Sequence, residues 1–116
     1  MTQVEIKNKD GIWEIHISGH AENPYPDMQG NLLCASISIL AYTLMQTVRD
    51  LKAKGSLKRC SESCKDGEVQ VIAEPEYWSE SQLEAKIGVI KTGYELLERQ
   101  FPGMVHVGGE MGSKTV

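Results

Sequence analysis

Near the N-terminus, apolar and polar residues alternate in two short runs, residues 4–6 and 13–17, on either side of the turn sequence Asn8-Lys9-Asp10-Gly11. Alternation with a period of two is typical of a half-buried strand, and Asp-Gly favours a tight turn. A weaker version of the pattern recurs at residues 57–64 and 69–75, around Lys65-Asp66-Gly67. The sequence therefore predicts two β-hairpins.

After each hairpin the apolar period changes to three and four residues, which is typical of one face of an α-helix. We expect the first helix to be capped by Asn31 and to end at Gly55, and the second to start at a Ser79/Gln82 capping box and to end before Pro102. The predicted buried positions are Leu33, Ile37, Leu40, Ala41, Leu44, Met45, Val48 and Leu51, then Leu83, Ile87, Ile90, Tyr94 and Leu97.

Residues 104–107 are long enough for a short closing strand. The predicted order is therefore ββαββαβ, and two helices with one apolar face each must cover one face of a largely antiparallel sheet. This is an α+β two-layer sandwich. We expect one catalytic domain over residues 1–107 and a flexible C-terminal tail over residues 108–116, with residues 19–30 as the longest loop.

The composition is that of a globular domain: 116 residues, of which 41% are hydrophobic and 24% charged. The net charge of −4 argues against direct nucleic-acid binding. No uninterrupted apolar run approaches the roughly 20 residues of a membrane helix, and no export signal is apparent. We therefore expect a cytoplasmic protein, without a membrane partner, whose three cysteines are reduced thiols.

Cys34 is the candidate nucleophile, because with Asn31 as the cap it takes the third helical position, where unpaired N–H groups favour an anion. A helix terminus contributes about 0.3–1 kcal/mol, and one pKa unit corresponds to about 1.4 kcal/mol, so a second cation is needed. His20, at the start of the loop that leads to Cys34, is the candidate general base. The backbone N–H groups of Cys34 and Ala35 are candidate oxyanion donors, and Ser38 is a candidate supporting residue.

Two motifs sharpen this hypothesis: Gly19-His20-Ala21, and Cys34-Ala35-Ser36-Ile37-Ser38 after the loop. They resemble the ribosomal-processing cysteine protease family, Prp. The resemblance implies a small homodimeric enzyme that needs no cofactor or metal. It would remove a short N-terminal extension from a large-subunit ribosomal protein, with His20 and Cys34 as the catalytic pair and Ser38 as the matching serine.

Asn31 departs from the family pattern, which commonly has an aspartate three residues before the cysteine. An asparagine can orient a histidine by hydrogen bonding but adds no charge. Residues 22–29 are a candidate flap that orders over the substrate, with Tyr25 and Met28 in contact with apolar substrate side chains. An idle surface loop is the alternative.

Another class of function also fits the sequence: a non-catalytic dimeric module that binds a peptide or the ribosome, with Cys34 packed beneath the helix as a small core residue. Cys60 and Cys64 lack further ligands for a zinc site. His16 and His20, four apart on a strand, are about 13 Å apart, too far for one metal. The glycines at residues 108–112 do not precede a helix pattern, so they do not indicate a dinucleotide site.

Overall fold

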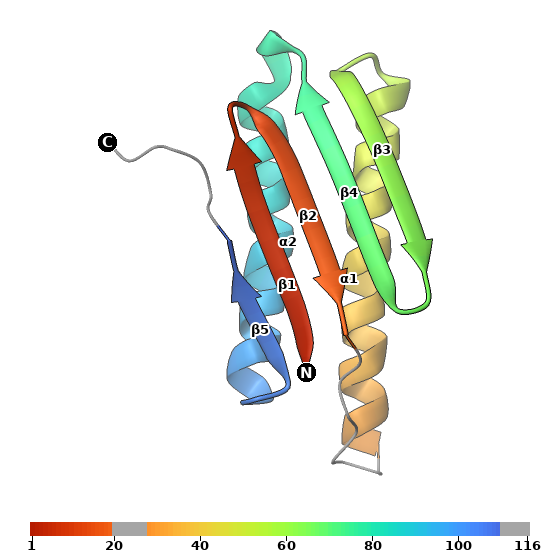
Figure 1. Cartoon of the computed structure of the whole chain (residues 1–116), viewed down its shortest axis with the longest axis vertical. Coiled ribbons are helices and arrows are strands. Elements are labelled where there is room, and N and C mark those ends of the chain that lie inside the picture. Colours follow the sequence, from red (N-terminus) through yellow and green to blue (C-terminus); the bar gives the residue numbers. More distant parts are fainter. Residues whose placement is uncertain (20–27, 110–116) are drawn as a thin grey trace, which may run out of the picture.

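The computed structural model describes residues 1–19 and 28–109, and for residues 28–31 it describes the backbone. Two hairpins, two long helices and a short final strand follow one another in the predicted order ββαββαβ (Figure 1). The elements are β1 (Thr2–Lys9), β2 (Ile12–Ser18), α1 (Met28–Ala53), β3 (Leu57–Lys65), β4 (Glu68–Pro75), a 3-10 turn (Tyr77–Ser79), α2 (Glu80–Gln100) and β5 (Val105–Gly108).

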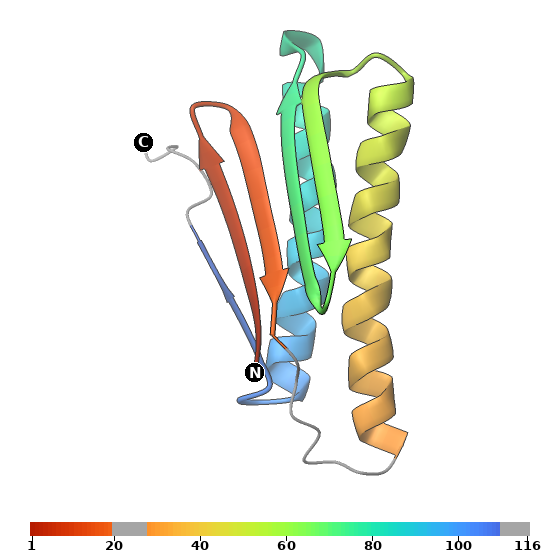
Figure 2. The same ribbon diagram turned by 45° about the vertical axis from the view of Figure 1, so that its right-hand side comes forward.

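The five strands form one sheet in the order β3-β4-β2-β1-β5. Three of the four strand pairs are antiparallel, and β5 runs parallel to β1 at the edge, with Val4 opposite Val107. Both helices lie on the same face of this sheet (Figure 2). The predicted α+β sandwich with a largely antiparallel sheet is therefore confirmed.

The core lies between the sheet and the two helices. On β2, Trp13, Ile15 and Ile17 are buried while the residues between them are partly exposed, as the period of two requires. On α1, six of the eight predicted positions are buried, and Ile37 and Leu40 pack against them as partly buried residues. The buried predicted residues of the helices are Leu33, Ala41, Leu44, Met45, Val48, Leu51, Leu83, Ile87, Ile90, Tyr94 and Leu97.

Tyr94 joins the two helices. Its side chain is fully buried, and its hydroxyl donates a hydrogen bond to the backbone carbonyl of Ile37 on α1 at 3.0 Å. Burial raises the pKa of the Tyr94 hydroxyl, because the charged phenolate is poorly solvated there. Next to it, a Cβ on Gly93 would lie 2.8 Å from a methyl group of Leu40, so the glycine allows the helices to approach closely here.

The start of α1 differs from the prediction. The helix begins at Met28, so Asn31 is its fourth residue and not its N-cap. Gly30 lies inside the first turn as well, because a glycine within a helix costs only about 1 kcal/mol and does not end it. The predicted loop over residues 19–30 is therefore shorter than expected by at least three residues.

Ser79 also has a different role from the one predicted. It is buried and forms no capping hydrogen bond at the start of α2. Its hydroxyl instead donates to the backbone carbonyl of Ser56 at 2.6 Å. The capping box is therefore wrong, and Ser79 links the start of α2 to the connection between α1 and β3.

Replacing Ser79 with alanine is expected to lower the free energy of unfolding by about 1 kcal/mol, because one buried hydrogen bond is lost. The Ser56 carbonyl keeps its second donor, the N–H of Glu76, which limits the cost. Urea denaturation measures the change. Ser81→Ala, at an exposed position two residues later, is the control and should stay within about 0.5 kcal/mol of the parent.

One helix of the described chain, over Leu32–Ala53 of α1, is long and apolar enough to cross a membrane by length and composition. The sequence prediction, which considered only uninterrupted apolar runs, did not identify this helix. Core helices of soluble proteins pass the same test, and α1 packs its buried face, including Leu44 and Val48, into the core with the sheet and α2. The finding is therefore weak support for a membrane span.

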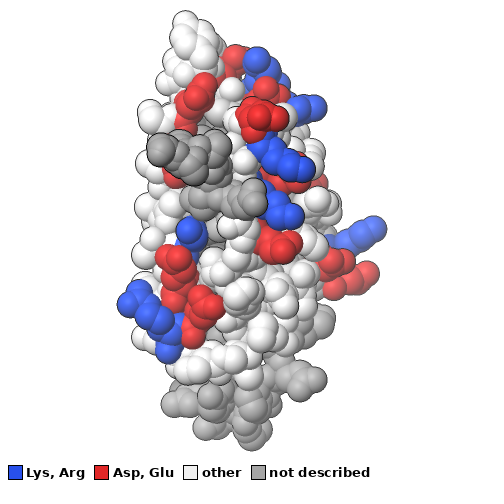
Figure 3. All heavy atoms as spheres, turned by 60° about the vertical axis from the view of Figure 1, so that its left-hand side comes forward, with Lys and Arg blue, Asp and Glu red and all other residues white. Residues whose placement is uncertain are grey.

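Charged side chains of both signs are interspersed on the face of the molecule seen in Figure 3. Acidic and basic groups alternate there at short range, and no area of that face is uniformly basic. A surface of this kind offers a polyanion no continuous site.

Candidate active site

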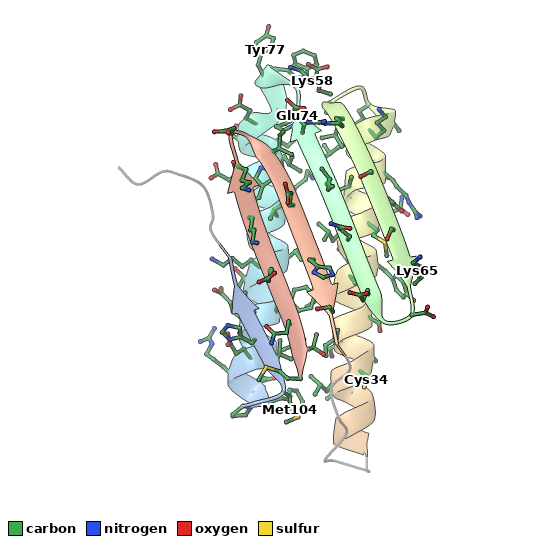
Figure 4. The ribbon with its side chains drawn as sticks, in the orientation of Figure 1. Cys34, Lys58, Lys65, Glu74, Tyr77 and Met104 are labelled. Carbon is green, nitrogen blue, oxygen red and sulfur yellow. The ribbon has the colours of Figure 1, made fainter. Side chains whose placement is uncertain are left out.

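Cys34 is exposed on α1, in the part of the helix that extends beyond the end of β2 (Figure 4). It is the seventh helical residue, counted from Met28, and not the third. The alternative prediction, in which Cys34 packs beneath the helix as a core residue, is therefore wrong, because Cys34 is exposed. The thiol is open to a ligand from solvent.

The later position of Cys34 changes how the site must work. The favourable field of a helix N-terminus falls off within the first turn, so it does not reach this thiol at the strength expected. Beyond the first four residues of a helix, each backbone N–H donates to the carbonyl four residues earlier. The N–H groups of Cys34 and Ala35 are therefore committed to α1, and their predicted role as oxyanion donors is wrong.

A hollow of about 260 Å³ lies beside Cys34, between α1 and the ends of the strands. Cys34 and Ser38 line it from the helix, Gly19 lines it at the end of β2, and the β3–β4 turn lines it on the far side. The complete described lining is Thr2, Ile17, Gly19, Cys34, Ile37, Ser38, Ala41, Tyr42, Cys64, Gly67, Glu68 and Val69. Gly19, the first residue of one motif, and Cys34 and Ser38 of the other therefore line one hollow.

Ser38 lies one helical turn after Cys34 and is exposed. Two neighbours on α1 use their hydroxyls to bond back to the helix: Ser36 donates to Leu32 at 2.8 Å and Thr43 donates to Ile39 at 2.7 Å. Within the described part of the chain, the Ser38 hydroxyl has no hydrogen bond. Ser38 therefore differs from these two neighbours in lining the hollow without a bond to the described part of its own helix.

Gly19 shows why the first motif starts with glycine. Its φ of +90° lies in the left-handed region, and a Cβ at this position would stand 2.5 Å from the backbone oxygen of Met1. The Thr2 hydroxyl donates to the Gly19 carbonyl at 3.4 Å, a long hydrogen bond. The chain therefore leaves β2 along a path that only glycine permits, and the next residue is His20.

His20 and Tyr25 lie outside the described residues, as does most of the predicted flap over residues 22–29. Met28 and Asn31 are described only as backbone at the start of α1. Their predicted roles stay predictions.

The two described histidines, His16 and His106, each lie close to a carboxylate. His16 Nε2 lies 3.1 Å from a carboxylate oxygen of Glu68, and His106 Nδ1 lies 3.4 Å from one of Glu98. His16 alternates with buried residues of β2, so its side chain lies on the sheet face away from the helices. Neither of these two described histidines lines the hollow.

Tyr42 and Cys64 are lining residues that sequence reasoning missed. Tyr42 lies eight residues after Cys34, a spacing that keeps it on the same side of a helix, so this signal was present. Cys64 comes from the end of β3, and no local sequence pattern indicates that this end lies opposite α1. Within the described residues there is no group of three or more metal-ligating side chains.

Cys60 differs from the other two cysteines because it is partly buried and packs against the core. Burial raises the pKa of its thiol, the negative charge of Glu62 adds to the increase, and Lys52 opposes it. We expect N-ethylmaleimide at pH 8 to modify Cys60 several times more slowly than the exposed Cys34 and Cys64, since the thiolate is the reacting form. Mass spectrometry of a timed digest measures the modification rate of each cysteine. Equal rates for the three cysteines would contradict the raised pKa of the Cys60 thiol.

An exposed thiol in a hollow, with an exposed serine hydroxyl one turn away, defines a candidate nucleophilic site on a small α+β sandwich. A hydrolase that works through a cysteine is the class that such a site indicates. A family model described as cysteine protease Prp matches residues 1–102, and the chain therefore belongs to this family of cysteine proteases. The resemblance seen in the two motifs is confirmed.

Solved structures share the fold over nearly the whole chain. SMU.848 from Streptococcus mutans is 19% identical with a TM-score of 0.65, covering 97% of this chain and 96% of its own. The ribosomal processing protease Prp from S. aureus, in complex with a covalently linked product peptide, is 16% identical with a TM-score of 0.67, covering 95% and 100%. The same protease with a substrate peptide is 13% identical, with a TM-score of 0.63 and the same coverage. No curated protein matches this chain.

Proposed function

We propose that this protease removes a short N-terminal extension from a large-subunit ribosomal protein, with Cys34 as the nucleophile and His20 as the general base. The observation that carries the proposal is the hollow that Cys34, Ser38 and Gly19 line together, in a member of this protease family. The S. aureus structure with a substrate peptide supports a peptide as the ligand.

In the proposed reaction, the Cys34 sulfur attacks the carbonyl carbon of the scissile bond while His20 holds the thiol proton. His20 then gives that proton to the leaving amine, and a thioester to Cys34 remains. Water, deprotonated by His20, attacks the thioester and releases the free thiol and the carboxylate product. Since the helix N–H groups are committed, the Ser38 hydroxyl is the described donor beside Cys34 that can stabilise the oxyanion.

The test uses the full chain and the precursor ribosomal protein of the same organism. The parent should shorten the precursor by one defined N-terminal peptide, seen by mass, and Cys34→Ala should leave it intact. Cys60→Ala is the matched control, since this thiol lies outside the hollow, and it should still cleave. An uncut precursor with the parent chain, or undiminished cleavage by Cys34→Ala, overturns the proposal.

Asn31 is proposed to orient His20. Because α1 begins at Met28, Asn31 does not cap the helix, so its amide need not be used at the helix start. It lies three residues before Cys34, a spacing that brings side chains close on one helix face. This supports a place beside the catalytic pair.

Replacing Asn31 with aspartate is expected to raise kcat/KM several-fold, because a carboxylate stabilises the imidazolium that pairs with the thiolate. Asn31→Ala is expected to lower it. Steady-state cleavage of a fluorogenic peptide measures both. An Asn31→Ala variant as active as the parent would exclude the orienting role.

A homodimer in the cytoplasm is also part of the proposal. Large apolar side chains stand exposed on the outer sides of both helices, at Leu32 (59%), Ile39 (60%) and Val89 (70%), which supports a covered helix face. Light scattering of the purified chain should give twice the mass of 12.9 kDa. A mass of one chain at micromolar concentration would exclude a stable dimer.

A further inference from the structure

The hollow extends well beyond Cys34 along α1. Cys34, Ser38 and Tyr42 follow one another at intervals of four residues and all line it. Eight residues of helix correspond to about 12 Å at the standard rise. An extended peptide covers that length with three or four residues. The far end of the hollow is therefore within reach of a substrate residue three or four positions from the scissile bond.

The floor of the hollow is apolar. Ile17 from β2, Ala41 from α1 and Val69 from β4 are all buried in the core and line the hollow from below. Among its described lining residues, Glu68 is the one with a carboxylate, and that group is paired with His16 on the sheet face away from the helices. The hollow therefore suits an uncharged, apolar group.

Tyr42 and Cys64, from two different elements, also line the hollow. Tyr42 on α1 is 58% exposed although it is a large aromatic residue. Cys64 belongs to β3, on which Cys60 packs against the core and Glu62 pairs with Arg49 of α1. Alternation along the strand places Cys64 on this same helix-facing side. The hollow is therefore lined by Tyr42 from α1 and by Cys64 from the helix-facing side of β3.

We propose that Tyr42 and Cys64 form the end of an apolar subsite that receives one large apolar side chain of the peptide and determines its size. This inference rests on the proposed function of Cys34. The volume of about 260 Å³ lies below the roughly 300–1,000 Å³ of pockets that enclose a whole small molecule. It is suited to a single side chain of a longer ligand.

The first experiment measures protection of Cys64 in the inactive Cys34→Ala variant. N-ethylmaleimide is added with and without a twelve-residue peptide that spans the junction of the precursor extension, and mass spectrometry follows each thiol. Saturating peptide should slow Cys64 modification about tenfold or more and leave Cys60, on the same strand but outside the hollow, unchanged. A matched peptide with aspartate at the position three or four residues from the junction should give no protection.

The second experiment shortens the side chain of Tyr42. Tyr42→Ala is expected to shift the ratio of kcat/KM for peptides with tryptophan against leucine at that position by about tenfold toward tryptophan, because the subsite becomes longer. Tyr77→Ala is the matched control, since Tyr77 is also an exposed tyrosine (82%) and does not line the hollow. Tyr42→Phe should keep the parent ratio, because the ring and not the hydroxyl forms the wall.

The two proposals fail in different ways. If the parent cleaves the peptide and Cys34→Ala binds it, but Cys64 is modified at an unchanged rate, the subsite is wrong and the protease assignment stands. An unchanged tryptophan-to-leucine ratio in an active Tyr42→Ala variant has the same meaning. If the parent cleaves nothing and no peptide binds, both proposals are overturned.

Discussion

Replacement of His20 by alanine is expected to reduce kcat/KM for peptide cleavage by two to four orders of magnitude, the usual contribution of a general acid–base group. Without the imidazole, the leaving amine receives no proton from the enzyme and Cys34 has no cationic partner. The residual activity should rise with pH, because hydroxide from the solvent must then take the proton that His20 no longer takes. The parent should show a plateau at lower pH, where the ion pair supplies the thiolate.

His16→Ala is the control for this prediction. His16 pairs with Glu68 and its side chain lies on the sheet face away from the helices, so its loss should leave cleavage within a few-fold of the parent. Stopped assays from pH 5 to pH 10 with a fluorogenic peptide compare the three proteins. If His20→Ala keeps the parent rate, or if His16→Ala shows the large loss, the base has been assigned wrongly.

Replacing Tyr94 with alanine is expected to lower the free energy of unfolding by about 3–5 kcal/mol, the usual cost of deleting a fully buried aromatic ring. A domain of this size has about 5–15 kcal/mol in total, so the variant is expected to be marginal. Tyr94 also holds the Ile37 carbonyl of α1, in the segment between Cys34 and Ser38. Activity should therefore fall together with stability.

Tyr94→Phe separates packing from the hydrogen bond and is expected to fold, with a loss of about 1 kcal/mol. Because the folded-state pKa of Tyr94 is raised, the stability that the neutral phenol contributes is complete below about pH 10, the unfolded value, and is lost as the pH rises above it. The Tyr94→Phe variant has no phenol, so its stability does not change through this ionisation. Urea denaturation at pH 8 and pH 11 should therefore show the two proteins converging at the higher pH, and a constant difference would contradict this.

Hydrophobic periodicity predicted the elements of this fold, because each strand and helix buries one face. The period of two in β2 and the three- and four-residue spacing in α2 are visible in the chain before any contact is known. The ends of the helices were less well predicted. Gly30 and Asn31 look like a loop and a cap, yet the structure includes both in α1, since their local preferences amount to about 1 kcal/mol and packing of the long helix exceeds that.

The two motifs indicated a nucleophilic cysteine and a histidine from the sequence alone, and the family assignment confirms the class of enzyme. The sequence did not show what surrounds them. The hollow combines residues from β2, α1 and the β3–β4 turn, and the meeting of these segments depends on the strand order β3-β4-β2-β1-β5. Strand order is a long-range property that no local pattern encodes.

The sequence by itself therefore determined which faces of the strands and helices are buried, and it singled out Cys34 as the candidate nucleophile. Tertiary structure decided that Cys34 is exposed in the second turn of α1 and not at the helix end, and that Tyr42 and Cys64 line the same hollow. The physical reason is that burial patterns are local, whereas the walls of a site are made by elements far apart in the chain.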